Sequence, residues 1–502
     1  MSVEGAELTQ TADLPSELAT PTHGPAYLSW IGIIRLGLVQ TALGAIVVLT
    51  TATLNRIMVV EYALAAVIPG ALVAFHYAVQ MSRPRWGYGS DMGGRRTPWI
   101  IGGMAVLAFG GALAALGTAL MGYAFWLGLC VSFVAFALIG LGVGASGTSL
   151  LTLLATRVAP RRRPAAASIV WIMMIAGFVV TAIIAGANLD PYSAQRLVAV
   201  STSVSLIAFF VAVVAVWGIE GAAPASKPSA PTQVESAEEP KPKVPFREAF
   251  QAVWAEQKAR QFTIFVFVSM LAYSAQDLIL EPFAGLVFGF TPGESTKLAG
   301  VQHGGVMLGM VLVALAGSAI GRGRFGSMRV WAVGGCLASA VAFLGLAMSA
   351  SFVETWPLRA NVFFLGLANG AFAVAAIGSM MGLANQGEAQ REGTRMGLWG
   401  AAQAVAFGLG GFLGTVAVDL ARALLETPHG AYATIFAAEA VLFVVSGMIA
   451  YRVAPGVALG GIELPDAQKS ARRAADPQVE PVSGSISRTT PSSISGPLQA
   501  AE

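Results

Sequence analysis

Long apolar runs separated by short polar stretches make up most of this chain. A helix rises about 1.5 Å per residue, so roughly 20 apolar residues cross the hydrocarbon core of a bilayer. The pattern therefore predicts an all-α membrane protein with about twelve transmembrane helices. The predicted spans lie near 31–54, 59–81, 99–122, 125–155, 165–188, 197–219, 261–284, 296–320, 330–351, 357–384, 397–421 and 430–452.

Composition agrees with a membrane as the main solvent. Hydrophobic residues make up 55% of the 502 residues and charged residues only 11%, which is too apolar for an ordinary soluble protein. The basic residues are scattered and the net charge is only +3, so no nucleic-acid partner is expected. Cys130 and Cys336 lie in separate apolar runs, which predicts neither a disulfide framework nor a paired metal site.

Polar stretches divide the predicted spans into two halves. Gly221 to Pro245 is rich in Pro, Ala, Ser, Glu and Lys, a composition that favours a disordered linker. A short repeat, Trp-Ile-Ile-Gly-Gly from Trp99 and Trp-Ala-Val-Gly-Gly from Trp331, opens the third and ninth spans, as in duplicated transporter folds. The sequence thus predicts a polar N-terminal tail (1–28), an N-terminal six-helix bundle (29–220), a cytoplasmic linker (221–258), a C-terminal six-helix bundle (259–453) and a disordered C-terminal tail (454–502).

The distribution of basic residues predicts the orientation of the chain. If the N-terminus is cytoplasmic, the inner loops between spans carry 19 Lys and Arg residues. The first 28 residues hold no Lys or Arg, so they lack the positive region of a signal peptide and are expected to be retained. We therefore expect a multi-pass protein of a bacterial inner membrane with both termini in the cytoplasm. The outer loops would then carry five basic residues: Arg56, Arg196, Lys297, Arg359 and Arg422.

The loop after the second span, from Gly87 to Pro98, reads Gly-Tyr-Gly-Ser-Asp-Met-Gly-Gly-Arg-Arg-Thr-Pro. It resembles the signature of the major facilitator superfamily, in which this loop links neighbouring helices and controls gating on the cytoplasmic side. Its glycines permit a tight turn, and its aspartate can pair with a following arginine or meet a helix N-terminus. A plain tight loop is the alternative. The residues of this loop motif are Gly87, Asp91, Gly94, Arg95 and Arg96.

Three further segments carry a narrower resemblance: Leu54 to Glu61, Ala272 to Phe283, and Val301 to Val306. Together they look like the PucC family, also called the bacteriochlorophyll delivery family. Its members are membrane proteins of phototrophic bacteria that help to assemble light-harvesting complexes and are thought to handle bacteriochlorophyll. The resemblance implies bacteriochlorophyll or a precursor as non-covalent cargo. It also implies light-harvesting or reaction-centre polypeptides, together with the pigment-synthesis machinery, as partners.

Ionisable side chains inside the predicted spans are costly and need an explanation. Asp277 and Glu281 are four residues apart on the seventh span, hence on one helical face. Gln302 and His303 on the next span are expected at similar depth, which predicts a polar cluster of all four residues. Such a cluster fits a proton relay, an axial imidazole ligand for the magnesium of a chlorin, or a polar substrate path. A structural hydrogen-bond network between the two helices is the alternative.

Other polar residues within the spans are weaker candidates. His76 lies alone in an apolar run, either as a second axial ligand or bonded to a backbone carbonyl. Arg35 and Gln40 match a stretch of the PucC family, although snorkelling to the interface explains Arg35 equally well. Glu439 in the last span has no assigned role. The protein alone offers no metal site, so a metal would come only with the pigment.

An enzyme is not expected, since no catalytic triad, Cys-His pair or phosphate loop occurs in a soluble stretch large enough for a catalytic domain. Gly142 to Gly147 matches a dinucleotide fingerprint in letters, but it lies inside a predicted span and is better explained by close helix packing. Two other functions remain open beside pigment delivery: a proton-coupled transporter of a small solute and a pigment-free assembly scaffold.

Overall fold

The computed structural model describes residues 27–82, 95–159, 162–220, 251, 254–316, 327–384, 392–425 and 427–453. Within these ranges the chain is helical, and eleven helices are long and apolar enough to cross a membrane. A twelfth apolar helix, Val67–Gln80, is shorter. The predicted all-α membrane fold is confirmed. Most of the predicted tails and linker, and the loop residues Gly87, Asp91 and Gly94, lie outside the described residues.

We call the helices before residue 221 the N-terminal half and those after residue 254 the C-terminal half. The N-terminal half contains α1 (Trp30–Val48), η1 (Leu49–Thr53), α2 (Leu54–Arg56), η2 (Ile57–Glu61), α3 (Val67–Gln80), α5 (Thr97–Met121), α6 (Phe125–Arg157), α7 (Arg163–Asn188) and α8 (Ala194–Val216). The C-terminal half contains α10 (Gln257–Phe288), α11 (Pro292–Ala316), α12 (Met328–Ser349), α13 (Leu358–Ala384), α14 (Glu392–Leu425) and α15 (Pro428–Val453).

The first span differs from its prediction. It was expected to end near residue 54, with Arg56 in an outer loop, but α1, η1, α2 and η2 form one continuous helical segment up to Glu61. Asn55 and Arg56 are buried inside it, because both side chains find hydrogen-bond partners on the C-terminal half. The polar dipeptide that suggests a loop is therefore a buried contact between the halves.

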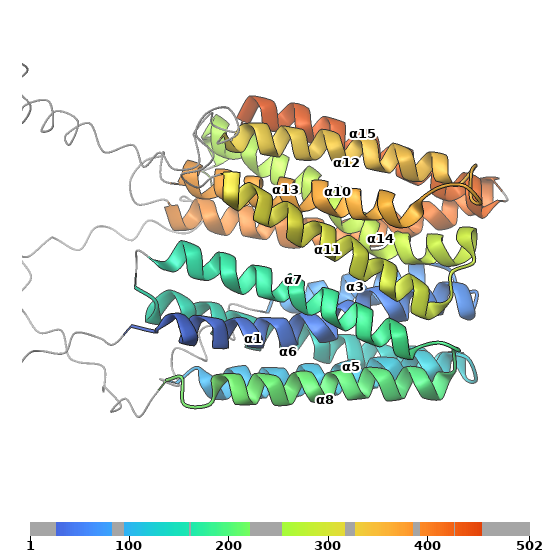
Figure 1. Cartoon of the computed structure of the whole chain (residues 1–502), viewed down its shortest axis with the longest axis horizontal. Coiled ribbons are helices and arrows are strands. Elements are labelled where there is room, and N and C mark those ends of the chain that lie inside the picture. The colour runs from blue at the N-terminus through green and yellow to red at the C-terminus, as the bar shows by residue number, and fades with distance from the viewer. Residues whose placement is uncertain are drawn as a thin grey trace, which may run out of the picture. The chain divides into compact units, whose positions relative to one another are not determined.

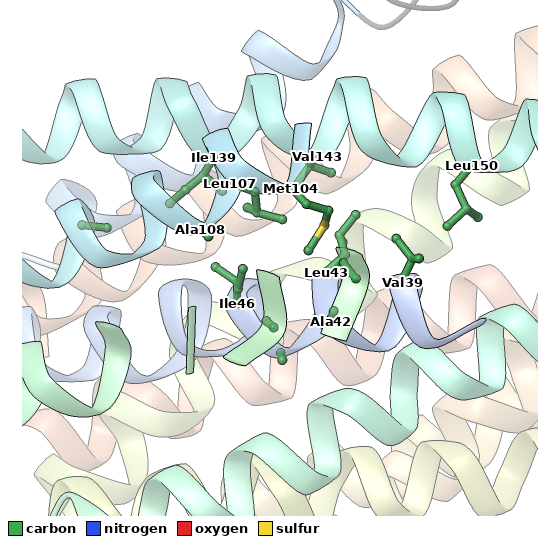
Figure 2. Packing of buried hydrophobic residues seen from close by; sticks show 14 of the residues in the cluster. Val39, Ala42, Leu43, Ile46, Met104, Leu107, Ala108, Ile139, Val143 and Leu150 are labelled. Carbon is green, nitrogen blue, oxygen red and sulfur yellow. The ribbon is translucent and has the colours of Figure 1, made fainter. Parts of the chain in front are cut away.

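The core of the N-terminal half is built from α1, α5 and α6. Figure 2 shows side chains of these three helices pointing toward one another, among them Leu43, Met104 and Val143. Small residues bring α5 and α6 close together: a Cβ on Gly142 would come within 2.6 Å of the Leu107 amide nitrogen. Gly142, which opens the segment that resembles a dinucleotide fingerprint, is therefore explained by close packing of α6 on α5.

The C-terminal half has a core rich in aromatic rings. Phe343 and Phe443 stack with ring centroids 5.5 Å apart, and Phe436 meets Phe283 edge to face at 4.9 Å. These rings join α10, α12 and α15, and Phe372 of α13 extends the group by packing edge to face on Phe443. Such offset and edge-to-face pairs are the preferred aromatic geometries. The C-terminal half therefore contains a firmly packed core of its own.

The halves meet along two helix pairs, α7 with α11 and α3 with α14. Figure 1 shows α7 and α11 side by side. We call the end of the helices that carries the α7–α8 and α10–α11 connections the outer end, as the basic residues predict. Here Asp190 accepts hydrogen bonds from Thr291 Oγ1 (2.8 Å) and Gly293 N (3.0 Å), which begin α11.

Asp419 of the C-terminal half makes the equivalent connection to the N-terminal half. Its carboxylate accepts hydrogen bonds from the amide nitrogens of Ala66 (3.0 Å) and Val67 (2.8 Å), which begin α3. Asp190 follows the fifth span of one half and Asp419 lies near the end of the fifth span of the other. Each carboxylate caps the second span of the opposite half, where unpaired N–H groups and the helix dipole favour a negative charge. The halves are thus joined at the outer end by two related caps.

Candidate functional site

His76 is bonded on both sides of its ring. It is 2% exposed on α3, and its Nδ1 lies 3.2 Å from the carbonyl oxygen of Val73. Because a carbonyl only accepts, Nδ1 carries the proton and Nε2 accepts a hydrogen bond from Gln80 Nε2 at 2.7 Å. Neither nitrogen presents an unused lone pair, so the geometry matches the structural alternative rather than a metal ligand.

Arg35 acts at a helix end. Its Nε donates to the carbonyl oxygen of Ala215 at 2.9 Å, and its Nη2 donates to that of Trp217. These carbonyls close the C-terminal end of α8, where a positive charge is favoured by the helix dipole. The contacts of Arg35 in this structure thus link α1 to α8.

His303 has a different environment from His76. It lies on α11, where its Nδ1 donates to the carbonyl oxygen of Ala299 at 2.8 Å. The ring meets Phe178 of α7 edge to face, with centroids 4.8 Å apart. No described residue makes a hydrogen bond to its Nε2. A ligating histidine commonly donates its second N–H to a backbone carbonyl, and His303 has this arrangement.

Gln40 reaches the same region from α1. Its Nε2 donates to the sulfur of Met174 at 3.1 Å, and Met174 and Phe178 pack against the buried residues Ile175, Val306 and Met310. The Gln40 side-chain oxygen is buried and has no hydrogen-bond partner among the described residues. We call Gln40, Met174, Phe178 and His303 the α7–α11 seam. It brings two predicted candidates, Gln40 and His303, to one apolar boundary between the halves.

The predicted cluster of four polar residues does not form. No hydrogen bond or ion pair between described residues joins Asp277 or Glu281 to His303 or Gln302. The reason is packing: α11 lies against α7 and α13 over most of its length and touches α10 little, although the two helices are consecutive. Gln302 is buried where the α11 backbone meets Gly366 of α13.

The two acids of α10 have separate neighbours. Asp277 interacts electrostatically with Glu439 of α15 and with Tyr273 one turn earlier. Glu281 interacts with Arg56 of the first span. Both carboxyl oxygens of Glu281 and of Glu439 are buried without a hydrogen-bond partner among the described residues. Each glutamate is thus a buried acid whose carboxyl group receives no hydrogen bond from the described residues.

Asn55 and Arg56 are site residues that the sequence reasoning missed. Pro282 has no N–H, so the carbonyl of Leu278 loses its partner within α10, and Asn55 Nδ2 donates to that carbonyl at 2.7 Å. Arg56 donates to Glu61 and to the carbonyl oxygen of Phe290. The flanking η1 and η2 are π-helical, a geometry that is frequent at functional sites. A proline inside the seventh span was the available signal.

The part of the loop motif that the structure describes caps α5. Glu220 accepts hydrogen bonds from the amide nitrogens of Arg96 (2.8 Å) and Thr97 (2.9 Å). Partial burial opposes the charged form, but these two hydrogen bonds, helped by the nearby Arg95 charge, outweigh it and lower the pKa of Glu220. Arg96 also donates to Thr156 of α6 at 3.1 Å. Glu220 therefore holds the start of α5 as a charged group.

Metal binding by the protein alone finds no support in the described part of the chain. There, no group of three or more His, Cys, Asp or Glu side chains is placed to hold a metal ion.

The fold is similar to that of solved membrane transporters. The chain superposes on a bacterial homologue of the human lysosomal transporter Spinster, in an inward-facing and unoccupied conformation, with a TM-score of 0.57 at 16% identity. That match covers 84% of this chain and 96% of the other. A peptide transporter, POT, in complex with alafosfalin matches with a TM-score of 0.62 at 16% identity, over 86% and 97% of the two chains.

Sequence comparison gives the family. The PUCC protein family model matches residues 53–456, so this chain belongs to the PucC family. It is 52% identical over 423 residues to the "Bacteriochlorophyll synthase 44.5 kDa chain" of Rhodobacter capsulatus, covering 84% of this chain and 95% of that protein. Protein PucC of Cereibacter sphaeroides is 30% identical over 429 residues, covering 81% and 88%. The family resemblance predicted from the three short segments is confirmed.

Proposed function

We propose that this chain binds bacteriochlorophyll, or a lipid-soluble precursor, in the bacterial inner membrane and delivers it to light-harvesting or reaction-centre polypeptides. Membership of the PucC family supports this role, as does the name of the relative from Rhodobacter capsulatus. The proposed role is non-catalytic: the protein holds and releases its cargo without changing covalent bonds. The distribution of basic residues predicts cytoplasmic termini, on the side where a delivery protein would meet the pigment-synthesis machinery.

The observation that carries the proposed site is the free Nε2 of His303. Its other ring nitrogen is already oriented by Ala299, so the neutral imidazole is held with one lone pair available. The magnesium of a chlorin needs one such axial ligand. The apolar side chains of the α7–α11 seam, including Phe178 and Met174, suit the face of a large planar ring.

A lateral route suits an apolar cargo. Next to the seam, α7 exposes Val180, Ile183 and Ile184, and α11 exposes Leu308 and Leu312. Exposed apolar side chains such as these are compatible with contact to lipid or to an apolar cargo. We therefore propose that the pigment enters between α7 and α11 from the bilayer, with its hydrocarbon tail remaining against lipid.

The test is the absorption spectrum of the protein purified in mild detergent from a phototrophic host. Wild-type protein is expected to carry bacteriochlorophyll, and His303→Ala is expected to lose most of it. His76→Ala is the matched control and should keep the pigment, because both nitrogens of His76 are already bonded. Full pigment in His303→Ala would reject His303 as the ligand, and a colourless wild type would reject the carrier role.

A proton-coupled transporter of a small solute is the second candidate. Buried acids without bonded partners, Glu281 and Glu439, and the half-buried Asp277 favour it, because such groups in membrane helices often carry protons. Solute uptake into cells that is independent of pigment and abolished by Asp277→Asn would favour this function. Antenna crosslinks formed by a pigment-free protein would instead favour an assembly scaffold.

A further inference from the structure

Arg56 and Glu281 are oppositely charged residue types buried at the same boundary between the halves. Each is 2% exposed. Arg56 uses two of its nitrogens, donating through Nη1 to Glu61 and through Nη2 to the carbonyl oxygen of Phe290 at 2.5 Å. Its Nε has no hydrogen-bond partner among the described residues, and neither have the two carboxyl oxygens of Glu281. One donor and two acceptors at this boundary therefore have no hydrogen-bond partner among the described residues.

The backbone of α10 allows the guanidinium to lie close to Glu281. Gly285 is one helical turn after Glu281, and a Cβ at Gly285 would come within 3.2 Å of both Nε and Nη2 of Arg56. Residues four apart lie on one helical face. Arg56 is also the charged group that acts electrostatically on Glu281. These observations place the guanidinium beside the helical face that carries Glu281.

We propose that Glu281 is a proton-binding site and that Arg56 becomes its ion-pair partner when the proton leaves. A buried carboxylic acid can stay unbonded at a modest cost, whereas a buried carboxylate requires a partner. On deprotonation the O–H bond of Glu281 breaks and the proton passes to water at the outer end. Arg56 keeps all its protons and exchanges Glu61 for Glu281. This inference does not depend on the identity of the cargo.

Several titratable groups face this site from the elements around it. Glu61 of η2, whose side chain is 28% exposed, connects Arg56 to the outer solvent. Asp277 lies one turn before Glu281 on α10, and Glu439 of α15 acts on Asp277. Tyr432 of α15 packs against Phe283 with ring centroids 5.4 Å apart. Only Arg56 among these groups carries a positive charge, which makes it the natural partner of a Glu281 carboxylate.

Proton binding would bias the closure of the outer end. Arg56 bonds to Phe290 across the halves, and Thr53, one turn before, contacts Thr296 of α11 with hydroxyl oxygens 3.0 Å apart. When Arg56 exchanges Glu61 for Glu281, it gives up a bond within the N-terminal half and gains an ion pair across the boundary between the halves. The proton on Glu281 therefore selects between two sets of contacts joining the halves.

The experiment measures both the proton and the conformation in lipid nanodiscs. Infrared difference spectra report the carbonyl stretch of protonated carboxylic acids as pH is raised. Spin labels on Gln195→Cys and Thr355→Cys, exposed positions at the outer end of each half, report the distance between halves in a Cys130→Ser background. Wild-type protein should lose a carboxylic-acid band on raising pH, together with a shift in the label distance.

Glu281→Gln should lack that band and hold one label distance at every pH. Glu439→Gln is the matched control: Glu439 is 3% exposed, and among the described residues it has no hydrogen-bond partner and only Asp277 acts on it electrostatically. This variant should keep the pH-dependent distance shift. Should Glu281→Gln fail to fold, Glu281→Asp should still show a titrating band, displaced in pH. A distance shift retained in Glu281→Gln, or a wild type with no titrating acid band, would overturn the proposal.

Discussion

At the scale of single residues, two histidines of this chain show how local bonding decides what an imidazole can do. His76 and His303 both use Nδ1 to donate to a carbonyl of their own helix. They differ at Nε2, where Gln80 occupies the first and no described residue bonds to the second. One neighbour four residues along the helix thus separates a structural histidine from a candidate ligand.

Replacing Gln80 by Leu tests whether the hydrogen bond from Gln80 to His76 Nε2 stabilises the fold. The substitution removes the hydrogen bond that Gln80 donates to His76 Nε2, which should cost about 0.5–1.5 kcal/mol of stability. Thermal unfolding of the purified protein in detergent measures the effect. Gln403→Leu is a control, because Gln403 makes only a long contact, 4.0 Å, to the sulfur of Met270. Equal losses in both variants would contradict this account of His76.

The sequence predicts which polar residues lie within the spans better than it predicts which residues they contact. An acid inside an apolar run is visible in one dimension, so Asp277, Glu281 and Glu439 were recognisable. Their partners depend on which helices pack together, and consecutive spans gave the wrong pairing for His303. Arg56 is predicted in a loop because its bond to the C-terminal half, to the carbonyl oxygen of Phe290, joins residues 234 positions apart and is not visible in the sequence.

At the scale of helices, the starts of several elements are fixed by carboxylates from elsewhere in the chain. Glu220 caps α5, Asp190 caps α11 and Asp419 caps α3. In each case an acceptor meets N–H groups that a helix leaves unpaired in its first turn. The last two caps cross between the halves, so the start of a helix and the closure of the outer end depend on the same bonds.

Removing the Asp419 cap should loosen this connection. Asp419→Ala deletes both hydrogen bonds to the start of α3 and is expected to cost about 0.5–2 kcal/mol, as measured by thermal unfolding. Asp190→Ala should have a similar effect at α11. Asn188→Ala serves as the control, since Asn188 bonds only to Ile184 of its own helix. If Asn188→Ala were as destabilising as Asp419→Ala, the caps would not be the cause.

The Glu220 cap should make stability depend on pH. Its pKa in the folded protein lies below the ordinary value of 4.5, so its contribution is complete above that value. The contribution disappears as pH falls through the lower, folded-state pKa. The difference in stability between wild type and Glu220→Gln should therefore be largest at neutral pH and shrink in acid. Unfolding temperatures of the two proteins measured from neutral to acid pH test this. A difference between them that does not change with pH would contradict a charged Glu220 cap.

At the scale of the whole molecule, exposed aromatic side chains occur at both ends of the helices. Tyr123 and Trp126 lie at the α5–α6 connection, which belongs to the outer end, while Trp30 and Trp217 lie at the opposite end. Tryptophan and tyrosine favour the two membrane–water interfaces. Together with the apolar exposed residues between them, they outline the part of the protein that a bilayer would cover.

The asymmetry of basic residues predicts which end faces the cytoplasm. A green fluorescent protein fused after residue 502 should be fluorescent, whereas alkaline phosphatase at the same place should be inactive. Alkaline phosphatase inserted after Glu354, in the connection between α12 and α13, should be active. The opposite pattern would reverse the orientation. This prediction depends on loop charges alone, and moving Arg56 into a span makes the outer side even poorer in positive charge.

Helical spans were predictable at this scale because each must be apolar over a fixed length, whatever its neighbours. The first two spans are the exceptions: the first helical segment continues to Glu61, and the second span, predicted from residue 59, begins at Val67. The first segment contacts α10 there, which the sequence does not show. Residues 83–94, which hold most of the loop motif, lie outside the described residues. The gating expected from the motif therefore stays a prediction.

The bond between Asn55 and the carbonyl of Leu278 has a consequence for biosynthesis. The N-terminal half leaves the ribosome first, with the Asn55 amide still lacking its acceptor. When α10 follows, Pro282 gives it a carbonyl that no donor in its own helix can satisfy, and an unmet polar group in lipid costs several kcal/mol. The earlier half therefore acts as a template that sets the register of the later one during insertion. Two halves produced as separate chains are expected to associate in the membrane for the same reason.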